Sequence, residues 1–264
     1  MIIQIIKNFL YLFSKDFLNL CMTFAYKDLK SKYSQTRFNF LLIILQPILT
    51  YFFNLLFSNL IRDEDLIPNY KIYLFLGFMT IYYISFLLIY TGQSFIQNYE
   101  LIRKTNIPKL VFPFSKAIVG IIDLFFWIIF IFILMLFFKL EFRIKIFFLF
   151  FVVPLHTICG LTLGLILFLI SYKHKDLYLF IPFIVSAIIL ITPVFYHPNL
   201  IPNNLKPFLF LNPIAGILEF YRYIFIGTAY NFSKFIYSFL FMIITFIFVI
   251  YLFQKKEKKI SEYI

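Results

Sequence analysis

Histidine, cysteine and glycine are scarce in this sequence of 264 residues, which contains 3, 2 and 7 of them. His156, His174 and His197 lie in separate segments, and no His-x-x-x-His or Glu-x-x-His pattern occurs. Cys21 and Cys159 form neither a Cys-x-x-Cys motif nor a disulfide framework. The glycines never form the Gly-x-x-x-x-Gly-Lys loop that holds nucleotide phosphates. We therefore expect no catalytic group, metal site or cofactor in this chain, and any ATP hydrolysis must take place on a separate polypeptide.

Charged residues are also few, at 14% of the chain, against about 25% in an average soluble domain. Hydrophobic residues make up 62%, and the mean hydropathy is +0.92. A water-soluble fold of this size could not bury so much apolar surface, so lipid must surround much of the chain. The net charge of +12 is carried at the ends of apolar runs, where it orients a membrane protein. This placement argues against a nucleic-acid partner.

Six apolar runs predict six transmembrane helices, because each run approaches or exceeds the roughly 20 residues that cross a hydrocarbon core. The runs are 38–61, 70–91, 113–138, 146–170, 177–195 and 235–253. Pro182 and Pro193 interrupt the fifth run, so neighbouring helices or water must satisfy the backbone groups freed there. The predicted fold class is an all-α polytopic membrane protein.

The segments that flank these runs are amphipathic or basic. Apolar residues recur with helical period over residues 2–24, which predicts a helix lying in the membrane interface. Lys and Arg concentrate on the side of the membrane that holds both termini, which indicates that both termini are cytoplasmic. We expect three parts: an interface segment with a basic stretch (1–37), a six-helix transmembrane domain (38–254) and a basic cytoplasmic tail (255–264).

The segment 196–234, between the last two runs, is too long and too apolar for a plain loop. The stretches 208–211 and 214–226 predict short helices that dip back into the bilayer. Glu219 and Arg222 are three residues apart, so they face the same side of a helix and can pair. A buried pair would fix the local conformation, whereas an exposed pair would contribute little.

Two further features lie inside the predicted spans. Asp123 is the one acidic residue well inside a run, and such carboxyl groups are costly and often functional. We favour a carboxyl group that hydrogen-bonds a neighbouring helix or stays protonated, because no second acid or base completes a proton relay. Gly160 and Gly164 form a Gly-x-x-x-Gly pattern, which predicts close helix packing within one subunit rather than a dimer interface.

Four local patterns occur in order along the chain. The first is Asp28-Leu29-Lys30-x-Lys32-Tyr33-x-x-Thr36 followed by Gln46-Pro47, and the second is Leu101-x-x-Lys104-x-x-Ile107-Pro108 followed by Phe112-Pro113. The third is Lys175-Asp176-Leu177, and the fourth is Thr192-Pro193-Val194-Phe195-Tyr196 followed by Ile201-Pro202, Leu211-Asn212-Pro213 and Tyr221-Arg222. This ordered set resembles the membrane (permease) subunit of ABC-2 type polysaccharide exporters, which move O-antigen, capsule or teichoic acid.

The resemblance implies a homodimeric channel and two separate ATP-binding cassette subunits, which carry the ATP and Mg²⁺. It also implies a lipid-linked polysaccharide as substrate and the bacterial inner membrane, with its lipid, as the location. The nearest alternative is an ABC-2 permease for a small drug or lipid; the order of Phe112-Pro113 and Asn212-Pro213 favours the polysaccharide branch. A membrane acyl- or glycosyltransferase would need clustered His, Asp or Glu, and a proton-coupled transporter would need a relay around Asp123.

The resemblance also assigns three groups of site residues. The interface group is Asp28, Lys30, Lys32, Tyr33 and Thr36. The group that couples to the ATPase lies within 93–109, where the sequence suits a short amphipathic helix, and consists of Phe95, Leu101, Arg103, Lys104 and Pro108. The gate group is Pro193, Tyr196, Pro202, Asn212, Pro213, Glu219 and Arg222.

Aromatic side chains offer flat apolar faces along which the C–H faces of sugars can slide without strong hydrogen bonds. Tyr51, Tyr82 and Tyr83 are our candidates for residues that line the channel. Where every face of a helix is apolar, periodicity does not separate lining residues from packing residues.

Overall fold

The computed structural model describes residues 14–34, 37–60 and 69–263. Every regular element in these ranges is a helix, as the sequence predicts. The predicted interface helix over 2–24 lies partly outside the described residues. Its described part belongs to α2 (Lys15–Ser34), which continues through most of the stretch that we expected to be a separate basic segment.

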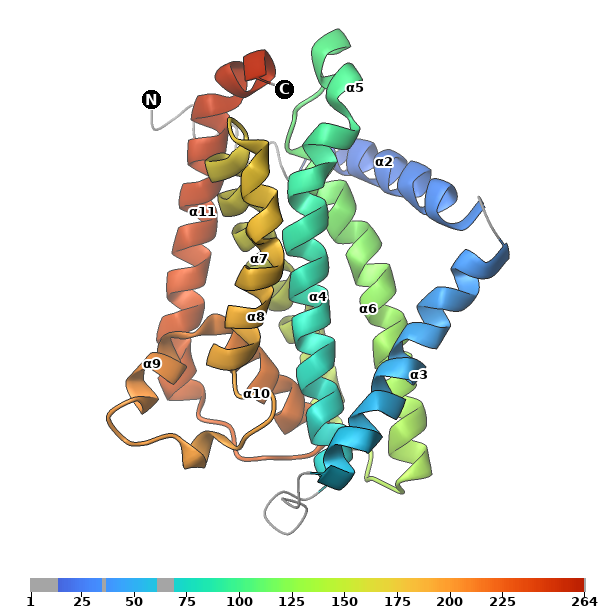
Figure 1. Cartoon of the computed structure of the whole chain (residues 1–264), viewed down its shortest axis with the longest axis vertical. Coiled ribbons are helices and arrows are strands. Elements are labelled where there is room, and N and C mark those ends of the chain that lie inside the picture. Colours follow the sequence, from blue (N-terminus) through green and yellow to red (C-terminus); the bar gives the residue numbers. More distant parts are fainter. Residues whose placement is uncertain (1–13, 35–36, 61–68, 264) are drawn as a thin grey trace.

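Helix α4 (Tyr70–Gln97) lies at the centre of the bundle (Figure 1). Helices α3 (Arg37–Leu60), α6 (Val111–Phe137) and α7 (Leu149–Ser171) pack against it. Helix α11 (Phe232–Tyr263) packs against α7. Most side chains of α4 are buried, which explains why its sequence is apolar on every side.

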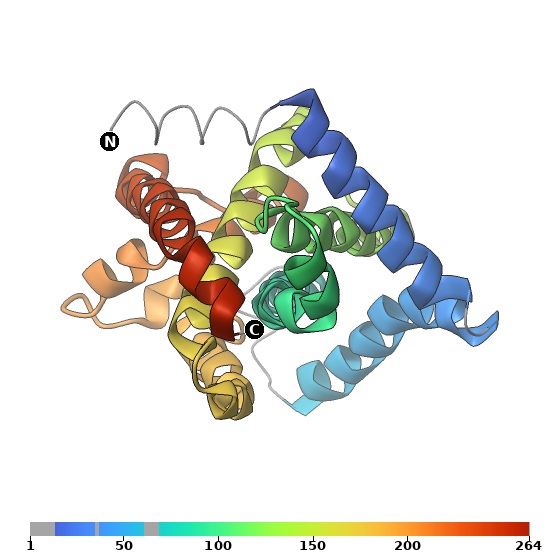
Figure 2. The same ribbon diagram turned by 90° about the horizontal axis from the view of Figure 1, so that it is seen from above.

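The short elements gather at the two ends of this bundle (Figure 1). One end, which we call the α5 end, carries α2, α5 (Tyr99–Lys104) and the C-terminal turns of α11. The other, which we call the α10 end, carries α9 (Lys206–Leu211) and α10 (Pro213–Phe225). Figure 2, viewed from the α5 end, shows α2 crossing one side of the bundle. The remaining elements are η2 (Ile144–Phe148), η3 (Lys175–Phe180), α8 (Ile181–Ile191) and η4 (Pro198–Leu200).

Four helical segments of the described chain are long and apolar enough to cross a membrane. They are Tyr70–Gln97, Val111–Phe137, Ile144–Ser171 and Phe232–Glu257, which confirms the predicted runs 70–91, 113–138, 146–170 and 235–253 as helices of that length. The first and fifth runs contain shorter apolar helices, Ile43–Leu56 and Asp176–Ile191, in the described residues. The count of six spans therefore stays a prediction.

The two prolines of the fifth run set the bounds of α8. Pro182 occupies the first turn, where its missing N–H is not needed, so it begins the helix rather than interrupting it. The helix ends at Ile191 because Thr192, which precedes Pro193, takes an extended conformation with φ −91° and ψ 137°. Short helices follow at η4, α9 and α10, and the last two lie where the sequence predicts short helices, at 208–211 and 214–226. Their entry into the bilayer stays a prediction.

The Gly-x-x-x-Gly pattern of α7 packs against α4 within the subunit, which confirms that prediction. A Cβ atom added at Gly160 would lie 2.5 Å from the side chain of Leu87. One added at Gly164 would lie 2.6 Å from Cβ of Thr91 and 2.8 Å from the carbonyl oxygen of Leu87. Because a backbone oxygen cannot move aside as a side chain does, Gly164 sets the distance between the two helices.

The variant Gly164→Ala should lower the thermal unfolding temperature in detergent, because overpacking of this kind costs about 1–3 kcal/mol. The control is Ala187→Val, which adds volume at an exposed position of α8 and should leave the unfolding temperature unchanged. An unchanged temperature for Gly164→Ala would show that α4 and α7 have room to separate.

Candidate transport site

Two ion pairs fasten α2 to α6 near the α5 end. Asp28 and Lys32, one turn apart on α2, pair with Lys116 and Asp123 of α6, each at 2.8 Å. The side chain of Asp123 is only 4% exposed, and that of Lys32 is 37% exposed. The expectation that Asp123 binds a neighbouring helix is thereby confirmed, with a lysine of the predicted interface group as its partner. The sequence alone did not indicate that Lys32 would be the partner of Asp123.

A cavity of about 780 Å³ lies between α2, α3, α4 and α6, beside these ion pairs. Its lining combines ammonium groups, amides and aromatic rings. The residues are Lys27, Asp28, Ser31, Lys32, Ile43, Gln46, Tyr82, Ser85, Phe86, Ile89, Tyr90, Gln97, Asn98, Lys116 and Val119. The three ammonium groups of the lining face Asp28 and, beside the cavity, Asp123, which pairs with Lys32. One positive charge remains in excess, so the cavity favours an anionic group together with a polar, ring-bearing one.

The three tyrosines that we expected in the channel lie in different places. Tyr82 lines this cavity and donates a hydrogen bond to Gln46 at 2.9 Å. Tyr83 is buried and shares a hydrogen bond with Thr157 of α7, so it belongs to the bundle interior. Tyr51 packs edge-on against Phe75 and is half-buried.

Of the rest of the predicted interface group, the structure describes one side chain. Lys30 is exposed on α2. Tyr33 lies in the last turn of α2, but its side chain is outside the described residues, as is the whole of Thr36. On the opposite side of the helix, Cys21 is buried, and burial raises the pKa of its thiol to about 12. That thiol is therefore protonated at neutral pH and is a packing group.

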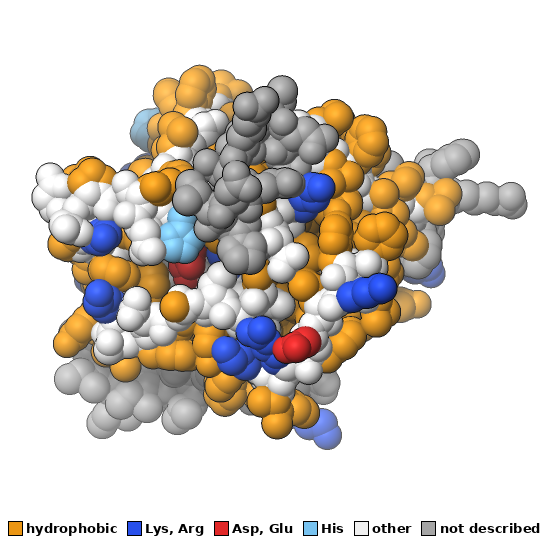
Figure 3. All heavy atoms as spheres, turned by 90° about the horizontal axis from the view of Figure 1, so that it is seen from below, with side chains coloured by type: hydrophobic (Ala, Val, Ile, Leu, Met, Phe, Trp, Pro, Cys, Tyr) orange, Lys and Arg blue, Asp and Glu red, His pale blue; other side chains and the backbone are white. Residues whose placement is uncertain are grey.

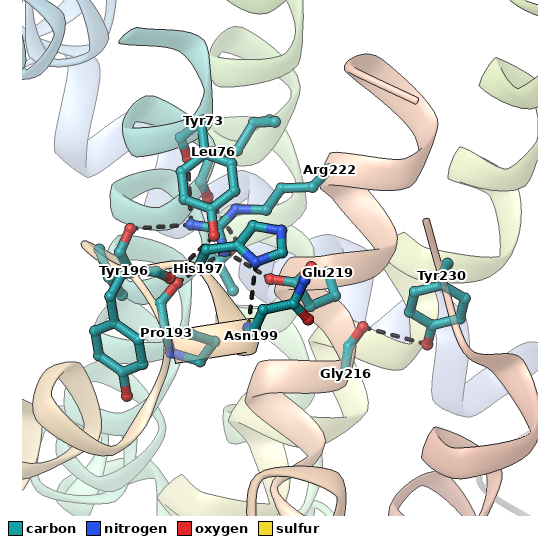
Figure 4. A network of polar contacts seen from close by, with 12 residues as sticks. Tyr73, Leu76, Pro193, Tyr196, His197, Asn199, Gly216, Glu219, Arg222 and Tyr230 are labelled. Carbon is teal, nitrogen blue, oxygen red and sulfur yellow. Dashed lines mark hydrogen bonds and ion pairs between the residues drawn. The ribbon is translucent and has the colours of Figure 1, made fainter. Parts of the chain in front are cut away.

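Arg222 is the polar centre of the α10 end (Figure 4). Its buried guanidinium donates to Glu219 Oε1 at 2.6 Å and to the carbonyl oxygens of Pro193 and Val194 at 2.8 and 2.9 Å. It also lies over the ring of Tyr73, 3.3 Å from the ring centroid. The predicted pair of Glu219 and Arg222 is confirmed, and it is buried.

Two tyrosines of α4 bind the next two carbonyl groups of the same loop. Tyr70 donates to the carbonyl of Phe195 and Tyr73 to that of Tyr196, both at 3.0 Å. We call Arg222, Glu219, Tyr70 and Tyr73 the Arg222 latch. The latch satisfies the consecutive carbonyls of residues 193–196, where the chain is neither helix nor strand.

The other predicted gate residues shape the chain around the latch. Asn212 caps α10, since its side chain accepts a hydrogen bond from the N–H of Ile214 at 3.0 Å and donates one to Thr192 at 3.3 Å. Pro213 occupies the first turn of α10. Pro202 is exposed in the loop before α9.

The predicted coupling group divides between the surface and the core. Arg103 and Lys104 are exposed on α5, and Leu101 and Pro108 are half-buried. Phe95 belongs to α4, which extends beyond the predicted run, and stacks on Phe168 of α7 with centroids 3.8 Å apart. Because Phe95 is fully buried, it supports α5 from within instead of facing a partner.

A contact that the sequence did not indicate joins this region to the C-terminal turns of α11. The carboxylate of Glu257 accepts the backbone N–H of Lys109 at 3.1 Å, and the ammonium of Lys109 donates to the carbonyl of Glu257 at 3.4 Å. We call this pair the Lys109–Glu257 clasp. Beneath it, Phe253 of α11 packs on Phe95. The surface at α5 and the end of α11 therefore form one packed unit.

Comparison with known proteins gives the family. The model of the ABC-2 type transporter family matches residues 19–226. The chain belongs to that family. This permease also matches two proteins named O-antigen export system permease protein RfbA, both from Klebsiella pneumoniae. They are 24% and 22% identical to it over 253 and 257 residues, and each match covers 93% of this chain and 95% of the relative.

We expect Lys32→Met to destabilise the ABC-2 permease more than Asp123→Asn does. Lys32→Met leaves the buried carboxylate of Asp123 without its ammonium partner, a loss of about 1–3 kcal/mol. Asp123→Asn instead leaves the ammonium group of Lys32, which can reach water. The double variant should cost less than the sum of the two. Thermal unfolding in detergent measures all three, and Lys30→Met is the control on the same helix. Additive effects would show that the ion pair adds nothing to stability.

The Arg222→Lys variant should open the loop at 192–200, because one ammonium group cannot bind two carbonyls and Glu219 together. Hydrogen–deuterium exchange of that segment should rise by about tenfold or more. Arg143→Lys, at an exposed arginine of the same end, is the matched control. Equal exchange in both variants would rule out the latch as the restraint on this loop.

Proposed function

We propose that this permease is the channel-forming subunit of an ATP-driven exporter of lipid-linked polysaccharide. As a homodimer, it works in the bacterial inner membrane with two ATP-binding cassette subunits, and both termini are cytoplasmic. Two relatives named as O-antigen export permeases support the polysaccharide class. The type of glycan (O-antigen, capsule or teichoic acid) is the part that the proposal leaves to experiment.

The observation that carries the proposal is the cavity between α2, α3, α4 and α6. A glycan carried on a lipid phosphate presents an anion, hydroxyl groups and apolar ring faces at one place. The excess positive charge that Lys27, Lys32 and Lys116 leave over Asp28 and Asp123 suits the anion. Tyr82 and Tyr90 offer aromatic faces to the first sugars. A purely hydrophobic drug or lipid tail would instead require an apolar lining, so the small-substrate alternative is less well supported.

The position of α2 supports access to this cavity from the membrane interface. Phe17, Cys21 and Ala25 form its buried stripe. Leu18 and Met22 form a second apolar stripe that is exposed. A helix that packs on the bundle by one stripe and offers another to its surroundings suits the boundary between lipid and headgroups.

At the same end, α5 offers a surface for the ATPase. Its exposed Arg103 and Lys104 project from a helix that Phe95 and Ile102 anchor in the core. A movement imposed on α5 would thus reach α4 and α11 directly, since the three share one apolar cluster.

Deletion of the gene should remove the glycan from the cell surface, and the wild-type chain should restore it and co-purify with an ATPase. The double variant Arg103→Glu/Lys104→Glu should restore surface glycan poorly and retain less than a tenth of the ATPase, because it reverses the charge of the docking helix. Lys139→Glu, an exposed charge reversal at the other end of α6, should behave like the wild type.

Unchanged surface glycan after deletion would overturn the proposal. If the deleted strain instead accumulates a dye or drug that the wild-type strain expels in an ATP-dependent way, the small-substrate alternative takes its place.

A further inference from the structure

A second cavity, of about 180 Å³, lies at the α10 end, away from the cavity beside α2. It is enclosed by η4, α9, α10, the loop after α10 and the first turn of α11. Its lining residues are His197, Pro198, Asn199, Lys206, Leu209, Phe210, Glu219, Ala229, Tyr230, Asn231, Lys234 and Phe235. Figure 3, viewed from this end, shows one histidine side chain next to one acidic side chain within a mixed polar and hydrophobic surface.

Glu219 is the buried polar group of this cavity. The residue is 6% exposed, and its Oε1 atom binds Arg222. Among the described residues, the second carboxylate oxygen, Oε2, has no hydrogen-bond donor. Oε2 is not among the buried unpaired atoms of the described residues, so it is open to the cavity, where a donor from water or from a ligand can reach it. Figure 4 shows His197 and Asn199 beside Glu219, on the cavity side of the latch.

The other lining residues indicate which kind of ligand would supply that donor. Tyr230 stacks on Phe235 with centroids 5.4 Å apart and on Phe220 with centroids 5.1 Å apart, so it is held within an aromatic cluster, and Phe210 adds a further ring to the cavity lining. Burial, and then the charge of Glu219, raise the pKa of the Tyr230 hydroxyl, so it remains a neutral group. Asn199 and Asn231 add amides that both donate and accept. Amides, an aromatic face and a carboxylate acceptor together suit a ring that carries several hydroxyl groups.

Charged ligands fit this cavity poorly. A metal ion would find a single carboxylate, already paired with Arg222, and would face the ammonium groups of Lys206 and Lys234. A free phosphate would be attracted by Lys206 and Lys234 but repelled by the carboxylate of Glu219 in the same lining, and it would leave Oε2 without a donor. A neutral polyol satisfies the acceptor without bringing a charge.

We propose that this cavity binds one sugar ring of a hexopyranoside, with a hydroxyl group donating to Glu219 Oε2 and an apolar ring face against Phe210. A volume of 180 Å³ corresponds to about six liquid-water molecules, which accommodates one ring and excludes a chain. The inference rests on the proposed function, since it makes the exported glycan the source of that ring. The sugar ring would contact the carboxylate of Glu219, which binds Arg222. Because Arg222 in turn binds carbonyl groups of the loop at 193–196, binding of the sugar would alter the position or stability of that loop.

The test uses the full-length chain in nanodiscs and saturation-transfer NMR with methyl glycosides of glucose, galactose, mannose and N-acetylglucosamine. At least one glycoside should receive saturation from the protein. The signal should fall at least fivefold in Asn199→Leu, which fills the cavity mouth, and in Glu219→Gln, which weakens the acceptor. Asn204→Leu, an exposed neighbour outside the lining, should keep the full signal.

No transfer to any glycoside at millimolar concentration overturns the inference, as does a signal that survives both Asn199→Leu and Glu219→Gln. Displacement of the sugar by inorganic phosphate or by Ca²⁺ also overturns it, because the site would then be ionic. The two proposals fail separately. If gene deletion leaves surface glycan unchanged while the nanodisc protein still binds a glycoside at this cavity, the exporter proposal fails and the sugar site stands.

Discussion

Four consecutive carbonyl groups, those of residues 193–196, are the constraint on which the α10 end is built. Pro193 prevents α8 from continuing, and no helix or strand takes up these groups. In an apolar environment each unsatisfied carbonyl costs several kcal/mol, so non-helical backbone is tolerated only inside protein. Arg222 and two tyrosines of α4 supply the donors, which fixes α10 against α4. The guanidinium is stabilised in turn by Glu219 and by the ring of Tyr73.

Local patterns in the sequence predicted much of this arrangement. Four apolar runs became helices of membrane-crossing length because length and hydropathy are properties of each run alone. The spacing of Glu219 and Arg222 predicted their pairing for the same reason, as one helix holds both. Gly160 and Gly164 predicted a close approach of two helices, although the pattern did not name α4 as the partner.

What the sequence did not predict depends on distant segments or on helices that are apolar on every side. Lys32 and Asp123 are 91 residues apart, and only the crossing of α2 over α6 brings them together. Phe95 has apolar neighbours whichever way it faces, so periodicity did not show that it points inward. Pro182 was expected to interrupt a helix that it in fact begins, because its effect depends on which turn it occupies. The lining of both cavities likewise comes from several segments at once.

The Lys109–Glu257 clasp has a consequence for the assembly of the chain during synthesis. Lys109 lies before three of the four membrane-length helices, and Glu257 closes the last of them. The loop that follows α5 therefore acquires its partner only after α11 has been made and inserted. Until then the exposed surface at α5 lacks its support from α11. If α5 binds an ATPase, as we propose, that binding would wait until the bundle is assembled, so incomplete chains would not compete for it.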